Sequence, residues 1–128
     1  MKTYQVNHAS WKEGPFGDFG SLLANPLGHT ETQAVDKIVI RCTKELAEKI
    51  SEKLKALKGS GMILTATAEF QPVALKNGDL GFTREQWEDK RTGENREQAS
   101  LYIRFATTPA WATAQKPKVD EIGNLGDI

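Results

Sequence analysis

One amphipathic helix constrains the fold of this chain more than any other sequence feature. Its apolar residues recur at intervals of four, four and three positions, at Leu46, Ile50, Leu54 and Leu57. Thr43 is a suitable N-cap, and Gly59 follows the last apolar residue as a stop signal. The pattern predicts a helix at about residues 44–58. Because the apolar stripe covers one side only, we expect the helix to lie against a sheet rather than inside a helical bundle.

Alternating apolar and polar residues predict strands on both sides of this helix. In residues 37–42, one face holds Ile38, Ile40 and Cys42 and the other holds Val39 and Arg41. After the helix, a longer half-buried strand is predicted over residues 62–70. Residues 84–89 and 98–107 flank a charged segment and predict a hairpin that turns near Gly93. In its second arm, Leu101, Ile103 and Phe105 share one face, and Tyr102 and Arg104 share the other.

The two ends of the chain show weaker patterns. Residues 1–6 predict a short strand, whereas residues 12–30 contain four glycines and two prolines and are interpreted as a loop. Residues 71–83 include an Asn-Gly pair and are interpreted as an excursion or tight turn. From about Ala112 the periodicity is lost, and we expect a flexible tail. The order of elements predicts a mainly β protein with one helix on a predominantly antiparallel sheet.

The composition is that of a soluble protein with one domain. The 128 residues are 38% hydrophobic and 27% charged, which suits a single globular core. No apolar run approaches the length of a membrane span, and the N-terminus lacks a signal-peptide core, so we expect a cytoplasmic protein without membrane contact. Cys42 is the single cysteine, which excludes an intramolecular disulfide and a Cys-rich zinc site.

The net charge is zero, but the acidic residues are unevenly distributed. Residues 120–128 contain three acids and no Lys or Arg, which leaves 17 basic residues against 14 acidic ones in the rest of the chain. This excess of three positive charges is small for a protein that binds a polyanion. An ordinary solvated surface explains it equally well.

Two long stretches of the sequence resemble a known family. They are IVIRCTKELAEKISEKLKALKGSGMILTATAEF and REQWEDKRTGENREQASLYIRF, which together cover about 55 of the 128 residues. The first contains a strand, a helix that ends in Leu57-Lys58-Gly59-Ser60, and a long strand; the second is a hairpin with Trp87, Asp89, Gly93 and Arg96. This order and spacing resemble bacterial single-stranded DNA-binding proteins. Residues 1–36, the insertion at 71–83 and the ending Gly126-Asp127-Ile128 depart from the family pattern, as in a divergent member from a phage or mobile element.

The resemblance implies both a fold and a function. The fold is a five-stranded oligonucleotide-binding barrel (OB-fold) over residues 1–111, followed by a flexible acidic tail over residues 112–128. The function is non-enzymatic, largely sequence-independent binding of single-stranded DNA in replication or recombination, by a homo-oligomer. The tail is expected to serve as a peptide for replication proteins or to compete for the DNA groove. A function of a different class remains open, in which a protein–protein adaptor or inhibitor uses the same barrel to dock a partner.

The second hairpin contains the main candidates for nucleic-acid contact. Trp87 lies in a polar segment and is interpreted as a platform for base stacking; the alternative is that its ring packs inward beside Phe82. Tyr102 and Arg104 face away from the apolar side of their strand, toward solvent or a ligand. The candidate phosphate contacts in this hairpin are Arg84, Lys90, Arg91 and Arg96. Neighbouring acids partly cancel these charges, so a solvated turn is the alternative interpretation.

A second group of candidates lies in the glycine-rich segment near the N-terminus. It consists of Trp11, Lys12, Phe16 and Phe19. Aromatic side chains on a loop suit base stacking, but small domains also bury such residues to hold a long loop in place. The segment is not a phosphate-binding loop of the nucleotide-binding type, because no Lys-Ser/Thr pair follows its glycines.

Catalysis has little support in the sequence. His8 and His29 have no partner at metal-ligand spacing, and Cys42 ends an apolar strand face as a small packing residue would. The acidic pair Glu88-Asp89 lies on a charged turn where nothing desolvates it. We therefore expect no enzyme activity, no metal and no cofactor.

Overall fold

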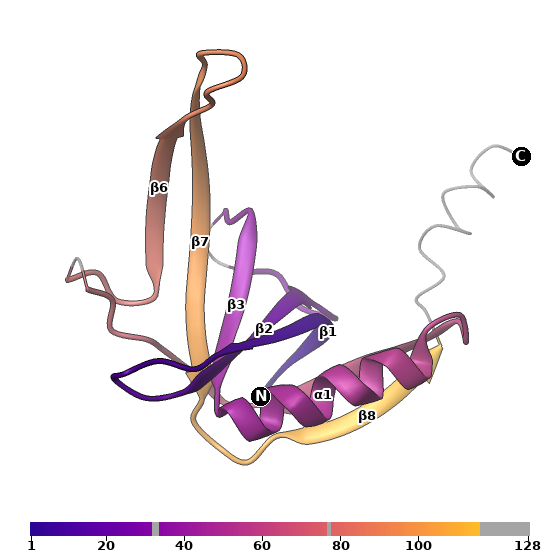
Figure 1. Cartoon of the computed structure of the whole chain (residues 1–128). Helices are drawn as coiled ribbons and strands as arrows, with labels where there is room; N and C mark the ends of the chain where they lie inside the picture. The colour runs from indigo at the N-terminus through magenta and orange to yellow at the C-terminus, as the bar shows by residue number, and fades with distance from the viewer. Residues whose placement is uncertain (32–33, 77, 116–128) are drawn as a thin grey trace, which may run out of the picture.

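The computed structural model of the protein describes residues 1–31, 34–76 and 78–115. Within them, eight strands and one helix are formed (Figure 1). The strands are β1 (Lys2–Lys12), β2 (Phe19–Pro26), β3 (Lys37–Cys42), β4 (Met62–Ala68), β5 (Phe70–Pro72), β6 (Phe82–Glu88), β7 (Asn95–Phe105) and β8 (Ala110–Gln115), and the helix is α1 (Lys44–Leu57). The protein is therefore mainly β with one helix, as predicted.

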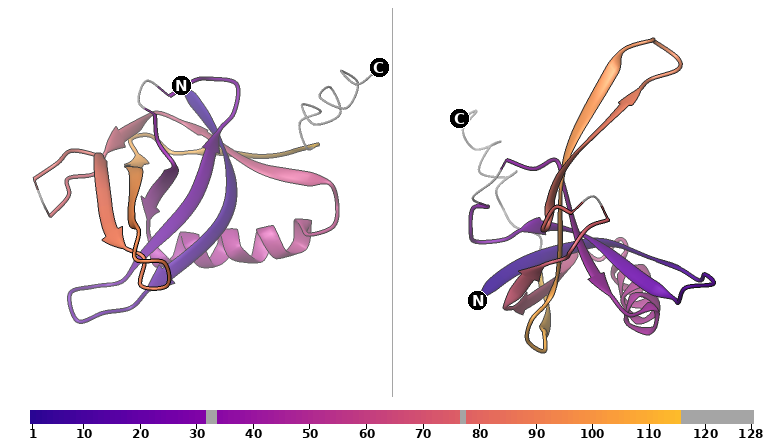
Figure 2. Two further views of the ribbon diagram at one scale, coloured as in Figure 1. Left: turned by 90° about the horizontal axis from the view of Figure 1, so that it is seen from above. Right: turned by 90° about the vertical axis from the view of Figure 1, so that its left-hand side faces the viewer.

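The eight strands belong to one curled sheet. Its order is β5-β7-β3-β2-β1-β4-β8, and β6 pairs with β7 as well. The pair β3–β7 is parallel, and the other pairs are antiparallel. Glu69 alone separates β4, which pairs with β1, from β5, which pairs with β7. The continuous segment β4–β5 thus pairs with strands near both ends of the sheet order, and the sheet curls into a half-barrel (Figure 2). The predicted count of five strands differs from the eight observed in the described residues.

The helix α1 forms where the apolar periodicity predicted it. The Thr43 hydroxyl accepts a hydrogen bond from the Leu46 backbone N–H at 3.2 Å, and the Lys58 N–H donates to the Lys55 carbonyl at 3.2 Å. Its apolar stripe faces β1 and β2, where Ile50 is buried. No helix in the described part of the chain is long and apolar enough to cross a membrane.

The concave side of the sheet and the helix enclose one apolar core. Its buried members are Tyr4, Val6, Ala9, Leu22, Ala24, Ile38, Ile40, Ile50, Leu64, Ala66 and Ile103. The predicted alternation of β3 and β7 is confirmed, because Ile38, Ile40 and Ile103 point into this core and Arg41 and Arg104 do not. The opposite side of β1, β2, β3 and β7 is called the outer face below.

Three expectations about strand boundaries are wrong. The first strand continues to Lys12 instead of ending at Val6, because a bulge between Val6 and His8 shifts the alternation by one residue. The expected loop at 12–30 contains β2, which pairs with β1 and β3. The predicted start of the tail, at about Ala112, is too early, because residues 112–115 belong to β8 and pair with β4. The rest of the expected tail, 116–128, lies outside the described residues.

A glycine in β2 allows the helix to approach the sheet. A Cβ atom at Gly20 would lie 2.5 Å from the Thr43 carbonyl oxygen, 2.6 Å from the Ala47 Cβ and 3.0 Å from the Cys42 Sγ. These distances are shorter than real Cβ contacts, and two of the three atoms are backbone or the first side-chain carbon, which cannot rotate away. Glycine at this position is therefore a packing requirement of the strand and not a loop signal.

Replacing Gly20 by alanine should destabilise the protein by about 1–3 kcal/mol, the usual range for overpacking a core. The free energy of unfolding, measured by urea denaturation, tests this. Gly14→Ala is the matched control, because a Cβ there meets its nearest atom at 3.7 Å and its φ is not positive. Equal unfolding free energies for the two variants would contradict the packing role of Gly20.

Candidate nucleic-acid interface

A groove on the outer face combines cations with aromatic rings. It is lined by Ser10, Lys12, Phe19, Ser21, Leu23, Lys37, Val39, Arg41 and Tyr102. Strand pairing brings these residues together, since Ser21 is opposite Arg41, Leu23 is opposite Val39, and Val39 is opposite Tyr102. The side chain of Val39 is only 3% exposed although it points away from the core, so it forms a dry floor for the groove.

The central residue of the groove is Arg41. Its guanidinium carbon lies 4.7 Å from the centre of the Phe19 ring and 5.3 Å from the centre of the Tyr102 ring, both within the range of a cation–π contact. Its Nη1 donates a hydrogen bond to the Ser21 hydroxyl at 2.9 Å. Neighbours on two strands, β2 and β7, therefore hold the guanidinium in place.

The outer face around Arg41 has an excess of positive charge. Arg41 is directly opposite Arg104 in the parallel β3–β7 pair, so two like charges lie on neighbouring strands. Lys12 and Lys37 add two further cations, and none of the groove-lining residues is Asp or Glu. Like charges in register repel one another. An anion bound between them would relieve this repulsion, which makes the face suited to a phosphate.

Two polar contacts fix the residues that border the groove. With the Gln71 amide oriented so that its oxygen faces Arg104, that oxygen accepts hydrogen bonds from Nε at 2.7 Å and from Nη2 at 2.9 Å. The Tyr102 hydroxyl donates to Glu85 Oε1 at 3.1 Å. Burial and this bond raise the pKa of Tyr102, and the bond places the Glu85 carboxylate beside the aromatic end of the groove.

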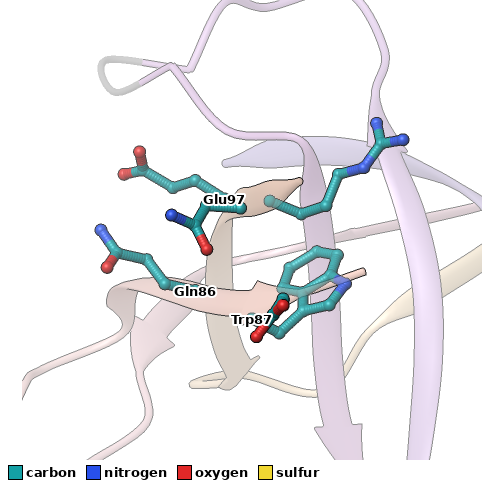
Figure 3. A pocket seen from close by; sticks show the side chains of 6 residues that line it. Gln86, Trp87 and Glu97 are labelled. Atoms are coloured by element: carbon teal, nitrogen blue, oxygen red, sulfur yellow. The ribbon is translucent and has the colours of Figure 1, made fainter. Parts of the chain in front are cut away.

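Trp87 lies farther along the same face, on the β6–β7 hairpin that projects from the sheet (Figure 1). It pairs with Arg96, which lies six positions before Tyr102 on β7, so the side chains of Trp87, Arg96 and Tyr102 share a face. At the rise of a strand, the six residue steps from Arg96 to Tyr102 span roughly 20 Å. Figure 3 shows the Trp87 ring on one side of the hairpin and the side chains of Gln86 and Glu97 directed to the other. The ring is 48% exposed.

The charges of the hairpin are mostly paired. Arg84 forms an ion pair with Glu97 at 2.9 Å, on the face opposite to Trp87. Arg96 lies 3.5 Å from both Asp89 and Glu94. Exposed pairs of this kind contribute little stability, so a phosphate can compete with them. The remaining predicted contacts, Lys90 and Arg91, lie exposed at the turn, and their side chains form no ion pair within the described residues.

The predicted contact residues near the N-terminus lie on the β1–β2 hairpin, but on different sides of it. Lys12 and Phe19 are opposite each other and both line the groove. Trp11 is opposite Gly20 and therefore lies on the helix side of the sheet, with 40% of its surface exposed. Phe16 is fully exposed at the tip of the hairpin. The structure thus brings Lys12 and Phe19 together with Tyr102, whereas Trp11 and Arg84 lie on other faces.

Sequence reasoning did not select Arg41, Lys37, Leu23 and the two serines of the groove. The sequence places Arg41 with Val39 on the strand face opposite Ile38 and Ile40, and a cation beside apolar residues is the available signal. Its significance depends on Phe19 and Tyr102, which the sheet places on either side of it. Phe19 was assigned to a loop, so this three-residue arrangement was not recognisable from the sequence.

Cys42 and His29, two residues of types that commonly serve in catalysis, are engaged in internal contacts. Burial raises the pKa of the Cys42 thiol to about 11, so the thiol is protonated at neutral pH and packs against the core. His29 Nε2 lies 3.2 Å from Glu31 Oε1, which also accepts a hydrogen bond from the Tyr4 hydroxyl. No group of three or more His, Cys, Asp or Glu side chains in the described part of the chain could hold a metal ion.

Comparison with known proteins identified no relative of this chain. No protein-family model, curated protein or solved structure matches the chain. The resemblance to single-stranded DNA-binding proteins therefore remains a prediction, and the arguments for function come from the residues of the outer face.

The contact between Tyr102 and Glu85 can be tested by titrating the phenol. Tyr102 should titrate above the usual tyrosine pKa of about 10, as followed by the NMR shift of its ring carbons. Glu85→Gln should lower this pKa without restoring the usual value, because burial is the larger cause. Glu97→Gln, a hairpin carboxylate on the opposite face, should leave it unchanged. An unperturbed Tyr102 would mean that Glu85 does not hold the ring.

Proposed function

We propose that the protein binds single-stranded DNA on its outer face, without catalysis and largely without regard to sequence. The observation that carries this proposal is the position of Arg41 between the rings of Phe19 and Tyr102, in register with Arg104. Single-strand binding combines aromatic faces for the bases with cations for the phosphates. The groove supplies both, and the carboxylates nearby belong to bordering residues such as Glu85.

The topology supports the finer fold assignment that this function implies. In an OB-fold, five strands form a partly open barrel, and the face of strands 2 and 3 and the loops 1–2 and 4–5 bind oligonucleotides. We assign β1, β2, β3, the bent strand β4–β5 and β7 to these five strands, with β6 and β8 as additions. On this assignment the groove lies on strands 2 and 3, and the β6–β7 hairpin belongs to the loop between strands 4 and 5.

This assignment gives the DNA a path from the groove to the hairpin tip. The bases would stack on Phe19 and Tyr102 in the groove and on Trp87 at the far end, all of which lie on the outer face. Arg41 and Arg104 would contact phosphates in the groove. At the tip, Lys90 and Arg91 would do so directly, and Arg96 after release from its carboxylate partners.

The wider role proposed from the family resemblance is replication or recombination in the cytoplasm, by a protein of a phage or mobile element. The acidic residues 120–128 would present a peptide to replication proteins. A protein–protein adaptor is the second candidate, and the paired charges of the β6–β7 hairpin favour it, because they leave little net charge there for a polyanion. Titration of labelled oligo-dT at two salt concentrations separates the two, since an adaptor should not bind the oligonucleotide.

Replacing Arg41 by alanine should weaken oligo-dT binding and reduce its salt dependence. Loss of one phosphate contact should lower the slope of log K against log salt by about 0.7 for a single strand. Arg84→Ala is the matched control, because it removes the same charge from the opposite face and should change the slope less. Fluorescence anisotropy over a salt series measures both. Identical slopes for the two variants would argue against the groove.

Replacing Trp87 by alanine should cost about 1–3 kcal/mol of oligo-dT affinity, the range for one lost base stack. The variant should stay folded, because the ring is half exposed and is not part of the core. Trp11→Ala removes a similarly exposed indole from the helix side and should leave affinity unchanged. Oligo-dT titrations measure the affinity of each variant, and circular dichroism spectra show whether the variant is folded. If Trp87→Ala binds normally, the hairpin is not part of the DNA path.

A further inference from the structure

The outer strand β8 leaves one edge of the sheet open. It pairs with β4 on one side, and no strand within residues 1–31, 34–76 and 78–115 pairs with its other side. An open edge presents unpaired backbone N–H and C=O groups, which can template the addition of another strand. Proteins usually protect such edges by short strands, proline or charged side chains.

The edge of β8 lacks the protection that the other outer strands have. The strand reads Ala-Trp-Ala-Thr-Ala-Gln over six residues, with no charge, proline or glycine. By contrast, β5 has three residues and ends at Pro72. The edge of β6 carries Arg84, Glu85 and Glu88. Among the outer strands of the described residues, β8 is therefore the one suited to accept a further strand.

The side chains of β8 leave room for a close neighbour. Residues 112–115 are exposed, and Trp111 is held on the core side beside Phe105, with ring centres 5.8 Å apart. Alanine and threonine allow a second backbone to reach the usual strand spacing of about 4.8 Å. The Thr65 hydroxyl donates a hydrogen bond to the Ala112 carbonyl at 3.3 Å, so the strand is anchored to β4 on its paired side.

We infer that β8 pairs antiparallel with β8 of a second copy of this chain, about a two-fold axis perpendicular to the sheet. A second copy fits because the strand is neutral throughout, so that identical strands meet without like charges in opposition. The symmetry also limits the register. Opposed residues must point to the same side of the joined sheet, so the residue at the axis faces its own counterpart. Pairing of most of the six residues then requires the axis to pass beside Ala112 or Thr113, at the middle of the strand. Either Ala112 or Thr113 then faces its own counterpart.

The oligomeric state without nucleic acid tests this inference, independently of the proposed function. Sedimentation velocity of the full chain should show a monomer–dimer equilibrium that shifts with protein concentration. Ala112→Lys and Thr113→Lys should each raise the dimer dissociation constant at least tenfold, because each places two like charges at or beside the two-fold axis. Gln86→Lys, at an exposed position on β6, should leave the dimer dissociation constant unchanged. A wild-type chain that stays monomeric, or lysine variants that dimerise normally, would overturn the inference.

Disulfide trapping tests the register in the same dimer. In a Cys42→Ser background, either Ala112→Cys or Thr113→Cys should form an intermolecular disulfide, since opposed residues of antiparallel strands have Cα atoms about 4.5–5.5 Å apart. Gln86→Cys should not cross-link. A dimer that forms while neither β8 cysteine cross-links would place the interface elsewhere and would falsify the inference. A dimer abolished by deleting residues 116–128, with β8 intact, would assign the contact to that segment instead.

Discussion

The bend at Glu69 is the constraint on which the rest of the structure depends. Before it, β4 pairs with β1; after it, β5 pairs with β7. The backbone at the bend is fully bonded, because the Glu69 N–H donates to the Thr107 hydroxyl at 3.0 Å and the Glu69 carbonyl accepts from the Ala106 N–H at 2.8 Å. Without this change of partner, the sheet would have two open faces and no enclosed core. The curl defines an inner side that holds the core and an outer side that carries the groove.

The curl also explains why β3 can position a charged residue accurately. Its central residues are buried on both sides, with Ile38 and Ile40 in the core and Val39 under the outer groove. Arg41 extends from this rigid strand between two rings and a serine. A side chain that is already ordered loses less conformational entropy when a ligand binds. The packing of the core thus bears directly on the affinity that the groove can reach.

The sequence predicted those elements whose signal is local. The helix and the alternation of β3 and β7 follow from side-chain periodicity, and all three were predicted correctly. β2 was missed because its inward residues begin with Gly20, which is required by contact with α1 and not by the strand itself. β1 was cut short because its bulge interrupts the alternation. The groove was missed in part because it depends on the parallel pairing of β3 with β7, strands that are far apart in the sequence.

The zero net charge of the chain does not weigh against a polyanion partner. Several carboxylates are neutralised locally, as Glu97 is by Arg84 and Glu13 is by Lys44. Four cations in or beside the groove, Lys12, Lys37, Arg41 and Arg104, form no ion pair within the described residues. At physiological salt, charges more than about 8 Å away are largely screened, so a phosphate in the groove would respond to these cations and to Glu85 at the border, and hardly to the acids of the distant hairpin tip. The distribution of the charges, and not their sum, therefore decides which ligand the outer face attracts.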